Sequence, residues 1–455
     1  TYSFTNSLHY FTLCVSLDAN LGDGGALVFD GGTLQTTSSF TTDRSTTLNG
    51  GGGTFETAGA GVTLTMDTVI DGVGTLTKEG AGTMLLLGSN TYSGGTLVNA
   101  GVLQVGANEV LYNSGSLTVA GGSFDVNGYT ETVGSVTLAS GLLDDTTGGG
   151  LLTAATYDLQ SGQVNSALGA GAISKTTGGT VVLNAATLAS TVDVSEGILQ
   201  LNQNELLDDL AALAVTGGSF DINGHSETVN SVVLGSGLLD DTTGGGLLTA
   251  ETYDLQSGQV NSALGTGAIS KTTGGTVVLN AATLAATVDI TGGLLQLDED
   301  EVIYNTAAVT MSSGTQLDLN DHTETIGSLA GAGDVDLGVG ALTTGGNDAD
   351  TLFSGVISGG GTVTKTGAGT MTLSGSNTYT GETMVVAGVL QSGADEVLYN
   401  SGSLRVAGGA YDINGYDETV GSVTLEAGLL DDTVGGGLLT AATYDLQNGQ
   451  VNSAL

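Results

Sequence analysis

The sequence predicts an all-β fold, a right-handed parallel β-helix (β-solenoid) made of about four superrepeats of ~95 residues. Three observations lead to this prediction. A long segment recurs along the chain, short runs of alternating apolar and polar residues are separated by glycine-rich turns, and proline is absent. A translational repeat stacks similar units into one elongated body, whereas 455 unrelated residues would form about three globular domains.

A near-identical internal duplication is the strongest of these observations. Residues 141–194 recur as residues 237–290, an offset of 96. The 54 aligned positions differ at only four pairs, which are Ala155 and Glu251, Ala170 and Thr266, Ser190 and Ala286, and Val194 and Ile290. A third copy begins at Gly428 and runs to the last residue. We interpret this pattern as a recent duplication of a structural unit.

Two sequence markers extend the period along the chain. The lysines are spaced by 97, 96 and 94 residues, and they are Lys78, Lys175, Lys271 and Lys365. An Asn turn followed by Glu-Thr recurs with spacings of 96, 97 and 94 residues, at Asn127, Asn223, Asn320 and Asn414. The superrepeats therefore fall at about residues 72–168, 169–264, 265–358 and 359–455. We expect a continuous solenoid over residues 51–455, preceded by a divergent N-terminal cap or donor-strand segment at residues 1–50.

Short β-like runs make up each superrepeat, for example TLVNAG, VLQVG and SLTVAGG. Alternation of apolar and small polar residues is typical of a half-buried strand. Glycine and Asn-Gly supply the positive φ angles that turns need. Proline cannot donate a ladder hydrogen bond, so its absence fits strands that lie in the interior of sheets. The run LLDDLAALAV at residues 206–215 is nearest to a helical pattern, but it aligns with a strand and a turn of the first copy.

The composition is strongly acidic, with 47 Asp and Glu against 6 Lys and Arg and a formal net charge of −41. Such a surface repels nucleic acid and anionic membranes, so we expect no nucleic-acid partner. No apolar run approaches the ~18 residues needed to cross a bilayer, and we expect no membrane span in the chain. Cys14 is the one cysteine, which excludes an intrachain disulfide. We expect its small side chain to be buried, and a cross-link to another chain is the alternative.

Two stretches resemble the passenger-associated repeat of bacterial autotransporters. They are LTKEGAGTMLLLGSNTYSGGTLVNAGVLQVG at residues 76–106 and VTKTGAGTMTLSGSNTYTGETMVVAGVLQSG at residues 363–393. The matching elements are the GAGT turn, the SNTYSGG or SNTYTGE turn, and the AGVLQ strand that follows. The second and third copies have TGGTVVLNAATLA instead. The resemblance implies a β-helical passenger displayed outside an outer membrane, with a role in adhesion, in biofilm formation or as a stalk.

The sequence departs from that family's pattern in two ways. It contains no translocator domain, and it stops at VNSAL, a string that continues as GAGAISK or GTGAISK in earlier copies. We expect the chain to be cut from something longer or to be completed by another molecule, because an uncapped solenoid end exposes unpaired strands. Candidate residues for head-to-tail self-association are Tyr2, Phe4, Tyr10 and Phe11 near one end and Leu455 at the other.

Paired acids are candidate calcium ligands, although the sequence requires no cofactor. Calcium takes several oxygen ligands from carboxylates and carbonyls. Asp-Asp pairs precede a Gly-Gly-Gly turn three times, at Asp144 and Asp145, Asp240 and Asp241, and Asp431 and Asp432. Asp298 and Asp300 lie in the densest acidic run. The alternative interpretation of all these residues is a solvated acidic surface that keeps the chain soluble.

The acid pairs are duplicated together with the scaffold, whereas a catalytic site should be a local exception to the repeat. We therefore expect no enzyme. The preferred function is an extracellular structural fibre or surface stalk that assembles end to end, in a biofilm matrix or cell-surface layer. The alternative is an autotransporter adhesin passenger that binds host or matrix, and a polysaccharide-degrading β-helix enzyme comes third. A matrix polysaccharide or the cell surface is the other candidate partner.

Overall fold

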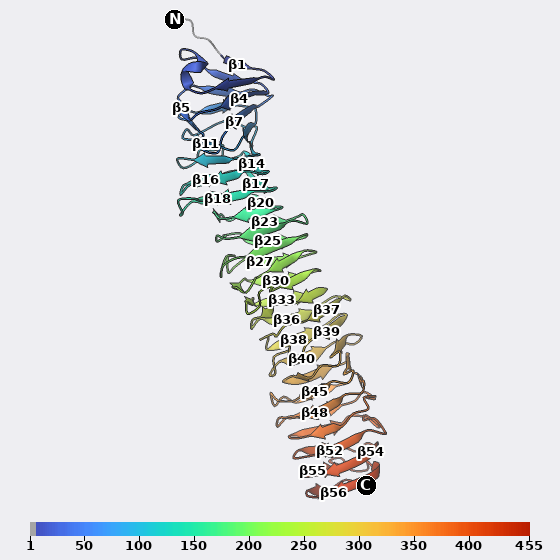
Figure 1. The fold of residues 1–455 in the computed structure, drawn as a ribbon. Coiled ribbons are helices and arrows are strands. Elements are labelled where there is room, and N and C mark those ends of the chain that lie inside the picture. Colours follow the sequence, from blue (N-terminus) through green and yellow to red (C-terminus); the bar gives the residue numbers. More distant parts are fainter. Residues whose placement is uncertain (1–5) are drawn as a thin grey trace. The chain divides into compact units, whose positions relative to one another are not determined.

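The computed structural model describes residues 6–455 and contains about 22 turns of parallel β-solenoid, which confirms the predicted all-β fold. It divides into two compact units, Thr1–Val229 and Asn230–Leu455. In each unit short strands stack one above another, and parallel pairing joins each coil to the next (Figure 1).

The first unit is built on three principal ladders. One contains β1 (Asn6–Leu8), β3 (Leu27–Phe29), β6 (Thr46–Leu48) and β9 (Ile70–Gly72). The second contains β2 (Thr12–Val15), β4 (Gly32–Thr36), β7 (Gly53–Thr57), β10 (Leu76–Glu79), β12 (Thr96–Val98), β14 (Ser116–Val119), β17 (Ser135–Leu138), β20 (Thr156–Leu159), β23 (Ala172–Lys175), β25 (Thr191–Val194) and β27 (Ala212–Val215). The third contains β5 (Phe40–Thr42), β8 (Thr63–Met66), β11 (Thr83–Leu86), β13 (Val102–Val105), β15 (Ser123–Asp125), β18 (Leu142–Asp144), β21 (Gly162–Val164), β24 (Thr180–Leu183), β26 (Ile198–Leu201) and β28 (Ser219–Asp221).

Shorter elements complete this unit. Strands β16 (Thr130–Thr132), β19 (Leu151–Thr153) and β22 (Ala167–Leu168) form a three-stranded sheet. The unit also holds β29 (Ser226–Thr228) and one 3-10 helix, η1 (Asp18–Leu21). The run at residues 206–215 ends in strand β27, as its alignment with the first copy predicted.

The second unit has the same construction. Its longest ladder contains β30 (Ser231–Leu234), β33 (Thr252–Leu255), β36 (Ala268–Lys271), β38 (Thr287–Ile290), β40 (Ala308–Met311), β43 (Ser328–Gly331), β46 (Thr351–Phe353), β49 (Thr370–Leu373), β51 (Val389–Ser392), β53 (Ala410–Asp412), β55 (Leu429–Asp431) and β57 (Gln450–Val451). Another contains β31 (Leu238–Asp240), β34 (Gly258–Val260), β37 (Thr276–Leu279), β39 (Leu294–Leu297), β41 (Gln316–Asp318), β44 (Asp334–Asp336) and β47 (Ile357–Ser358). A third contains β42 (Glu324–Thr325), β45 (Ala341–Thr344), β48 (Thr362–Lys365), β50 (Thr383–Val385), β52 (Ser403–Val406), β54 (Glu418–Leu425) and β56 (Leu439–Leu446), and β32 (Leu247–Thr249) pairs with β35 (Ala263–Leu264).

The registers fix how many residues make one coil. Leu76 pairs with Thr96, 20 residues later, whereas Thr156 pairs with Ala172, 16 residues later. Coils of unequal length nevertheless stack in register because the difference is taken up by the turns. Each superrepeat can therefore vary outside its strands while its inward positions stay aligned.

The core consists of columns of apolar side chains that stack from coil to coil. In one column Leu103 pairs with Phe124, Phe124 with Leu143 and Leu143 with Val164, and each has 0% of its surface exposed. Full burial of such a side chain stabilises the fold by about 1.5–3 kcal/mol. Because one coil cannot enclose its own apolar face, this stabilisation comes from its neighbours above and below.

A guanidinium group fixes the first turns of the first unit. Arg44 is buried, and its Nε donates to Asp18 Oδ1 at 2.8 Å. Its Nη2 donates to the carbonyl oxygen of Gly22 at 2.6 Å and its Nη1 to that of Gly25 at 3.0 Å. One side chain thus holds helix η1 and the loop that follows against the coils beneath. Whether residues 1–50 act as a cap or as a donor segment stays a prediction.

Candidate functional site

Four buried glutamates, one after each Asn turn, hold a loop of the preceding coil. Glu131 accepts hydrogen bonds at 2.8 Å from the backbone nitrogens of both Val110 and Leu111. Glu227, Glu324 and Glu418 bind the loops at 206–207, 302–303 and 397–398 in the same way. All four carboxyl groups lie in the interior, at 0–1% exposure. Burial raises the pKa of Glu131, Glu227 and Glu418 to about 7 and that of Glu324 to about 8, although the two N–H donors favour the ionised form.

A second carboxylate completes each of these contacts from the opposite side. Glu109, in the left-handed region at φ 54°, accepts from the hydroxyl of Thr132 at 3.0 Å and from the amide of Asn113 at 2.7 Å. Glu109 therefore reaches forward to the coil that carries Glu131, while Glu131 reaches back to the loop that carries Glu109. This exchange fixes an exposed loop that presents Tyr112 to solvent.

The four lysines are buried as well, and each fixes a corner of the solenoid. The ammonium of Lys78 donates to the carbonyl oxygens of Glu79 at 2.7 Å, Gly80 at 2.9 Å and Ala100 at 3.1 Å. A Cβ at Gly101, which has φ +64°, would lie 2.8 Å from this nitrogen. Burial lowers the pKa of Lys78 to about 8. Equivalent bonds to backbone carbonyls are made by Lys175, Lys271 and Lys365.

The predicted calcium ligands in the Asp-Asp pairs are bound to backbone amides. Asp145 accepts from the backbone nitrogens of Gly128 at 2.6 Å, Gly148 at 3.1 Å and Gly150 at 2.7 Å, so both of its oxygens have N–H partners. Asp144 accepts from the amide of Asn165 at 3.1 Å. The other pairs follow this pattern, namely Asp240 with Asp241 and Asp431 with Asp432. Their geometry is that of carboxylates that stabilise a glycine turn.

The acidic run in the second unit lies on the surface. Asp298 accepts from the amide of Asn320 at 3.0 Å, and Asp300 accepts from the backbone nitrogen of Thr323 at 2.8 Å. The ring of His322 lies 3.1 Å from Asp300. Across residues 6–455, no group of three or more His, Cys, Asp or Glu side chains is arranged to hold a metal ion. Calcium binding stays an untested prediction.

The proposed assembly residues are exposed where the structure describes them. Tyr10 is 83% exposed and Phe11 49%, and Leu455 is 44% exposed. Tyr2 and Phe4 lie outside the described residues. Cys14 was expected to be buried, and this expectation is wrong. It precedes the buried Val15 on strand β2, so the alternation of the strand turns its thiol outward.

An open groove of about 550 Å³ lies in the first unit, beside the ends of strands β16 and β19. Thr132 pairs with Thr153 across these strands, and residues of the turns that follow also line the groove. The lining residues are Asn113, Ser114, Thr132, Val133, Gly134, Thr153, Ala154, Ala155, Ala170 and Gly171. None of them ionises.

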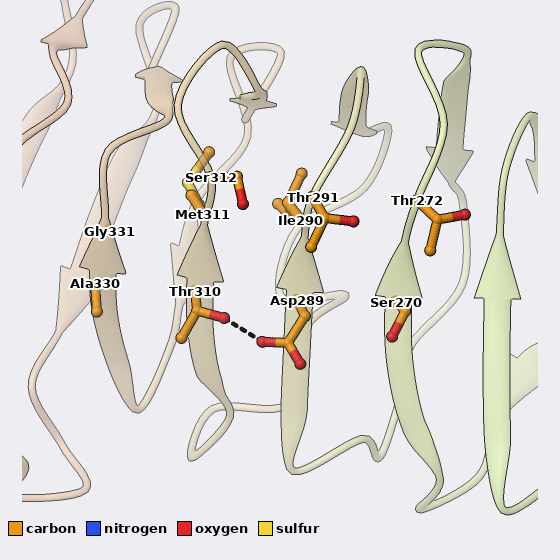
Figure 2. Close-up of a pocket in the computed structure, with 10 residues that line it drawn as sticks. All are labelled: Ser270, Thr272, Asp289, Ile290, Thr291, Thr310, Met311, Ser312, Ala330 and Gly331. Carbon is orange, nitrogen blue, oxygen red and sulfur yellow. Dashed lines mark hydrogen bonds between the residues drawn. The ribbon is translucent and has the colours of Figure 1, made fainter.

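A second groove, of about 440 Å³, lies in the second unit (Figure 2). Ser270 on β36, Asp289 on β38, Thr310 on β40 and Ala330 on β43 occupy one outward row, because each pairs with the next. The Thr310 hydroxyl donates to Asp289, which leaves the carboxylate engaged within the wall of the groove. No helix in the described part of the chain is long and apolar enough to span a membrane.

Parts of the chain are similar to known autotransporter sequences. The model of the passenger-associated-transport-repeat family matches residues 76–105 and 363–391, the two stretches in which the sequence resemblance was found. The chain carries the repeats of an autotransporter passenger. It is 33% identical over 202 residues to the "Adhesin BmaC autotransporter" of Brucella suis biovar 1 (strain 1330). That alignment covers 41% of this chain and 6% of the relative, so the chain spans a small part of that protein. No solved structure matches the chain.

The passenger repeat owes its sequence pattern to contacts between coils. In the first repeat, Asn90 accepts from the backbone nitrogen of Ile70 at 2.7 Å and donates to the carbonyl of Val110 at 2.9 Å, so one amide joins three coils. Asn377 makes the same two bonds in the second repeat. The buried hydroxyls of Tyr92 and Tyr379 bind those of Thr96 and Thr383, respectively. The SNTY turn is therefore a structural element, and both comparisons support surface or extracellular display.

Proposed function

We propose that this chain is a non-catalytic stalk segment of a passenger displayed outside an outer membrane. The observation that carries the proposal is the use made of the buried charged side chains. Glu131 and Lys78, and their equivalents in the other superrepeats, bond to the backbone of adjacent coils. Groups with perturbed pKa values in a cleft would point to catalysis, but here they are enclosed in the scaffold and repeat with it.

The acidic surface supports the same function. With a net charge of −41, an exposed solenoid repels neighbouring copies and the anionic surface of the cell beneath it. Such repulsion keeps a displayed segment soluble and directed away from the membrane. The exposed Tyr10, Phe11 and Leu455 leave head-to-tail assembly into a fibre as an additional proposal, which sedimentation of the purified chain over a range of concentrations would test.

A register-preserving deletion tests the stalk. Removing residues 141–236 joins Ser140 to Gly237, the equivalent of Gly141, and takes out about five coils. At ~4.8 Å per coil the stalk shortens by about 24 Å. Cells that display the chain from a translocator domain should still export the shortened form, and an N-terminal epitope should become less accessible to antibody. If an unrelated five-coil solenoid inserted at the deletion restores antibody access to the epitope, the result supports a stalk.

The adhesin alternative has comparable support, since the matched relative is named an adhesin. It makes a different prediction for the same deletion and replacement variants. If the segment itself binds host cells or matrix, the unrelated solenoid restores epitope access but does not restore adhesion. That result would favour an adhesin over a stalk as the function of this segment.

A further inference from the structure

We propose that the groove beside β16 and β19 binds an uncharged oligosaccharide chain. This binding function goes beyond the stalk and does not depend on it. The proposal rests on the chemistry of the groove and on a comparison of the internal copies.

The groove lining combines small apolar residues with polar ones. Val133, Ala154 and Ala155 supply apolar surfaces, and Asn113, Thr132 and Thr153 supply polar groups. Two of these polar side chains are held in place, because the Asn113 amide and the Thr132 hydroxyl both donate to Glu109. Each keeps an oxygen that can accept a hydrogen bond. Apolar surfaces that accommodate C–H faces, together with oriented hydrogen-bonding groups in the same lining, match a pyranose ring.

The absence of charge selects among possible sugars. The chain carries 47 acidic residues, yet all ten residues that line the groove are uncharged. An anionic polysaccharide would be repelled by the surrounding surface. The carboxylate beside the groove, that of Glu109, already accepts from Asn113 and Thr132, which weakens its attraction for a cationic polymer. A neutral glycan matches this lining. Two exposed tyrosines lie close by in the chain, Tyr112 immediately before Asn113 and Tyr129 immediately before β16, and both can offer aromatic faces to sugar rings.

The internal duplication shows that these positions changed separately from the scaffold. Of the four differences between residues 141–194 and 237–290, two lie in the groove, where Ala155 and Ala170 become Glu251 and Thr266. Gly134 corresponds to Asn230, and Asn113 and Ser114 correspond to Asp209 and Leu210. The last copy carries the same residues as the first at eight of the ten lining positions, at 400–401, 419–421 and 440–442. The second copy has thus replaced half of the lining while its strands stayed almost unchanged.

This comparison supplies a variant that the fold tolerates. Ala155, Ala170 and Ala442 are exposed, and the second copy already carries Glu and Thr at the first two positions. The triple variant A155E/A170T/A442E places bulk and charge in the groove and at the position near the C-terminus that corresponds to Ala155. Ser190 is exposed and lies outside the groove, so S190E is the matched control for an added charge.

The full chain is titrated with neutral linear oligosaccharides of glucose, galactose, mannose and N-acetylglucosamine, and with one anionic and one deacetylated amino-sugar polymer. We expect a neutral oligosaccharide to bind, the triple variant to bind it at least about tenfold more weakly, and S190E to bind as the wild type does. Matching melting curves would exclude misfolding as the cause. Failure of every neutral glycan to bind, equal binding by the triple variant, or tighter binding of either charged polymer than of any neutral glycan would each overturn the proposal.

Discussion

The Glu131 carboxylate lies 2.8 Å from the backbone nitrogen of Leu111, a residue of the preceding coil. The same carboxylate also binds Val110, so one side chain satisfies two backbone donors of a loop that has no ladder partner there. An unpaired buried N–H costs about 1–3 kcal/mol, and these loops therefore depend on the glutamate. Its recurrence at Glu227, Glu324 and Glu418 makes it part of the repeat.

Replacing Glu131 by alanine should destabilise the first unit by about 2–4 kcal/mol, because both backbone donors lose their acceptor and a cavity remains. Urea unfolding followed by circular dichroism measures the change. Asp71→Asn, at an exposed carboxylate on β9, is the control and should leave the transition unchanged. Equal stability of E131A and the wild type would show that water satisfies the loop in its place.

The buried glutamates also predict how stability depends on pH. Their pKa values in the folded chain, about 7 to 8, lie above the ordinary value of 4.5 for a glutamate carboxyl, so the fold favours the protonated form. The resulting destabilisation is complete above about pH 8 and vanishes below about pH 4.5, which means that stability rises as pH falls through this window. The urea midpoint should be higher at pH 5 than at pH 7.5. E131Q removes one titrating group and should reduce the difference.

The repeat period and the alternation of residues were sufficient to predict the solenoid, because both follow from stacking with inward apolar columns. The roles of the buried charges could not be predicted in this way. Glu131 and Lys78 served only as markers of the period, although a charged residue that recurs in every copy within a β-like run is itself a signal of burial. Their partners, Leu111 and Ala100, depend on coil length, which only the registers reveal.

Lys78 should be required for the corner at Gly80 and Gly101. Lys78→Met keeps the apolar stem but leaves three carbonyl oxygens without their donor, and we expect a loss of about 1–3 kcal/mol. Because the folded pKa of about 8 lies below 10.5, the charged form is disfavoured in the fold. As pH rises from 8 to 10.5, deprotonation of Lys78 should therefore increase the free energy of unfolding of the wild type. K78M should show no such increase. Identical pH profiles would contradict the burial of the ammonium.

Calcium should have no specific effect on the Asp-Asp turns. Both oxygens of Asp145 accept from backbone nitrogens, so a metal would have to displace those bonds. We expect equal melting temperatures in calcium and in magnesium at the same concentration, since both ions screen the acidic surface alike. D145A should instead loosen the glycine turn at 148–150, which amide hydrogen exchange would detect. A higher melting temperature in calcium than in magnesium, abolished by D145A, would show that calcium binds at this turn.

A pair of buried hydroxyls near the last Asn turn allows a double-mutant test. Tyr411 lies 2.8 Å from the hydroxyl of Ser392 and donates to Glu418 at 3.2 Å, so the Ser392 hydroxyl must donate to Tyr411. The first copy has Val105 and Phe124 at the corresponding positions. Each hydroxyl is therefore expected to stabilise the fold only when the other is present.

Y411F leaves the buried Ser392 hydroxyl without a partner and should cost about 1–3 kcal/mol, and S392V should cost about 1 kcal/mol. The double variant S392V/Y411F recreates the apolar pair of the first copy and should be less destabilised than the sum of the two, with a coupling of about 0.5–3 kcal/mol. Urea unfolding of the four proteins measures this coupling. Strict additivity would mean that the hydroxyls act independently, and that the first copy cannot be used to predict which substitutions the last one tolerates.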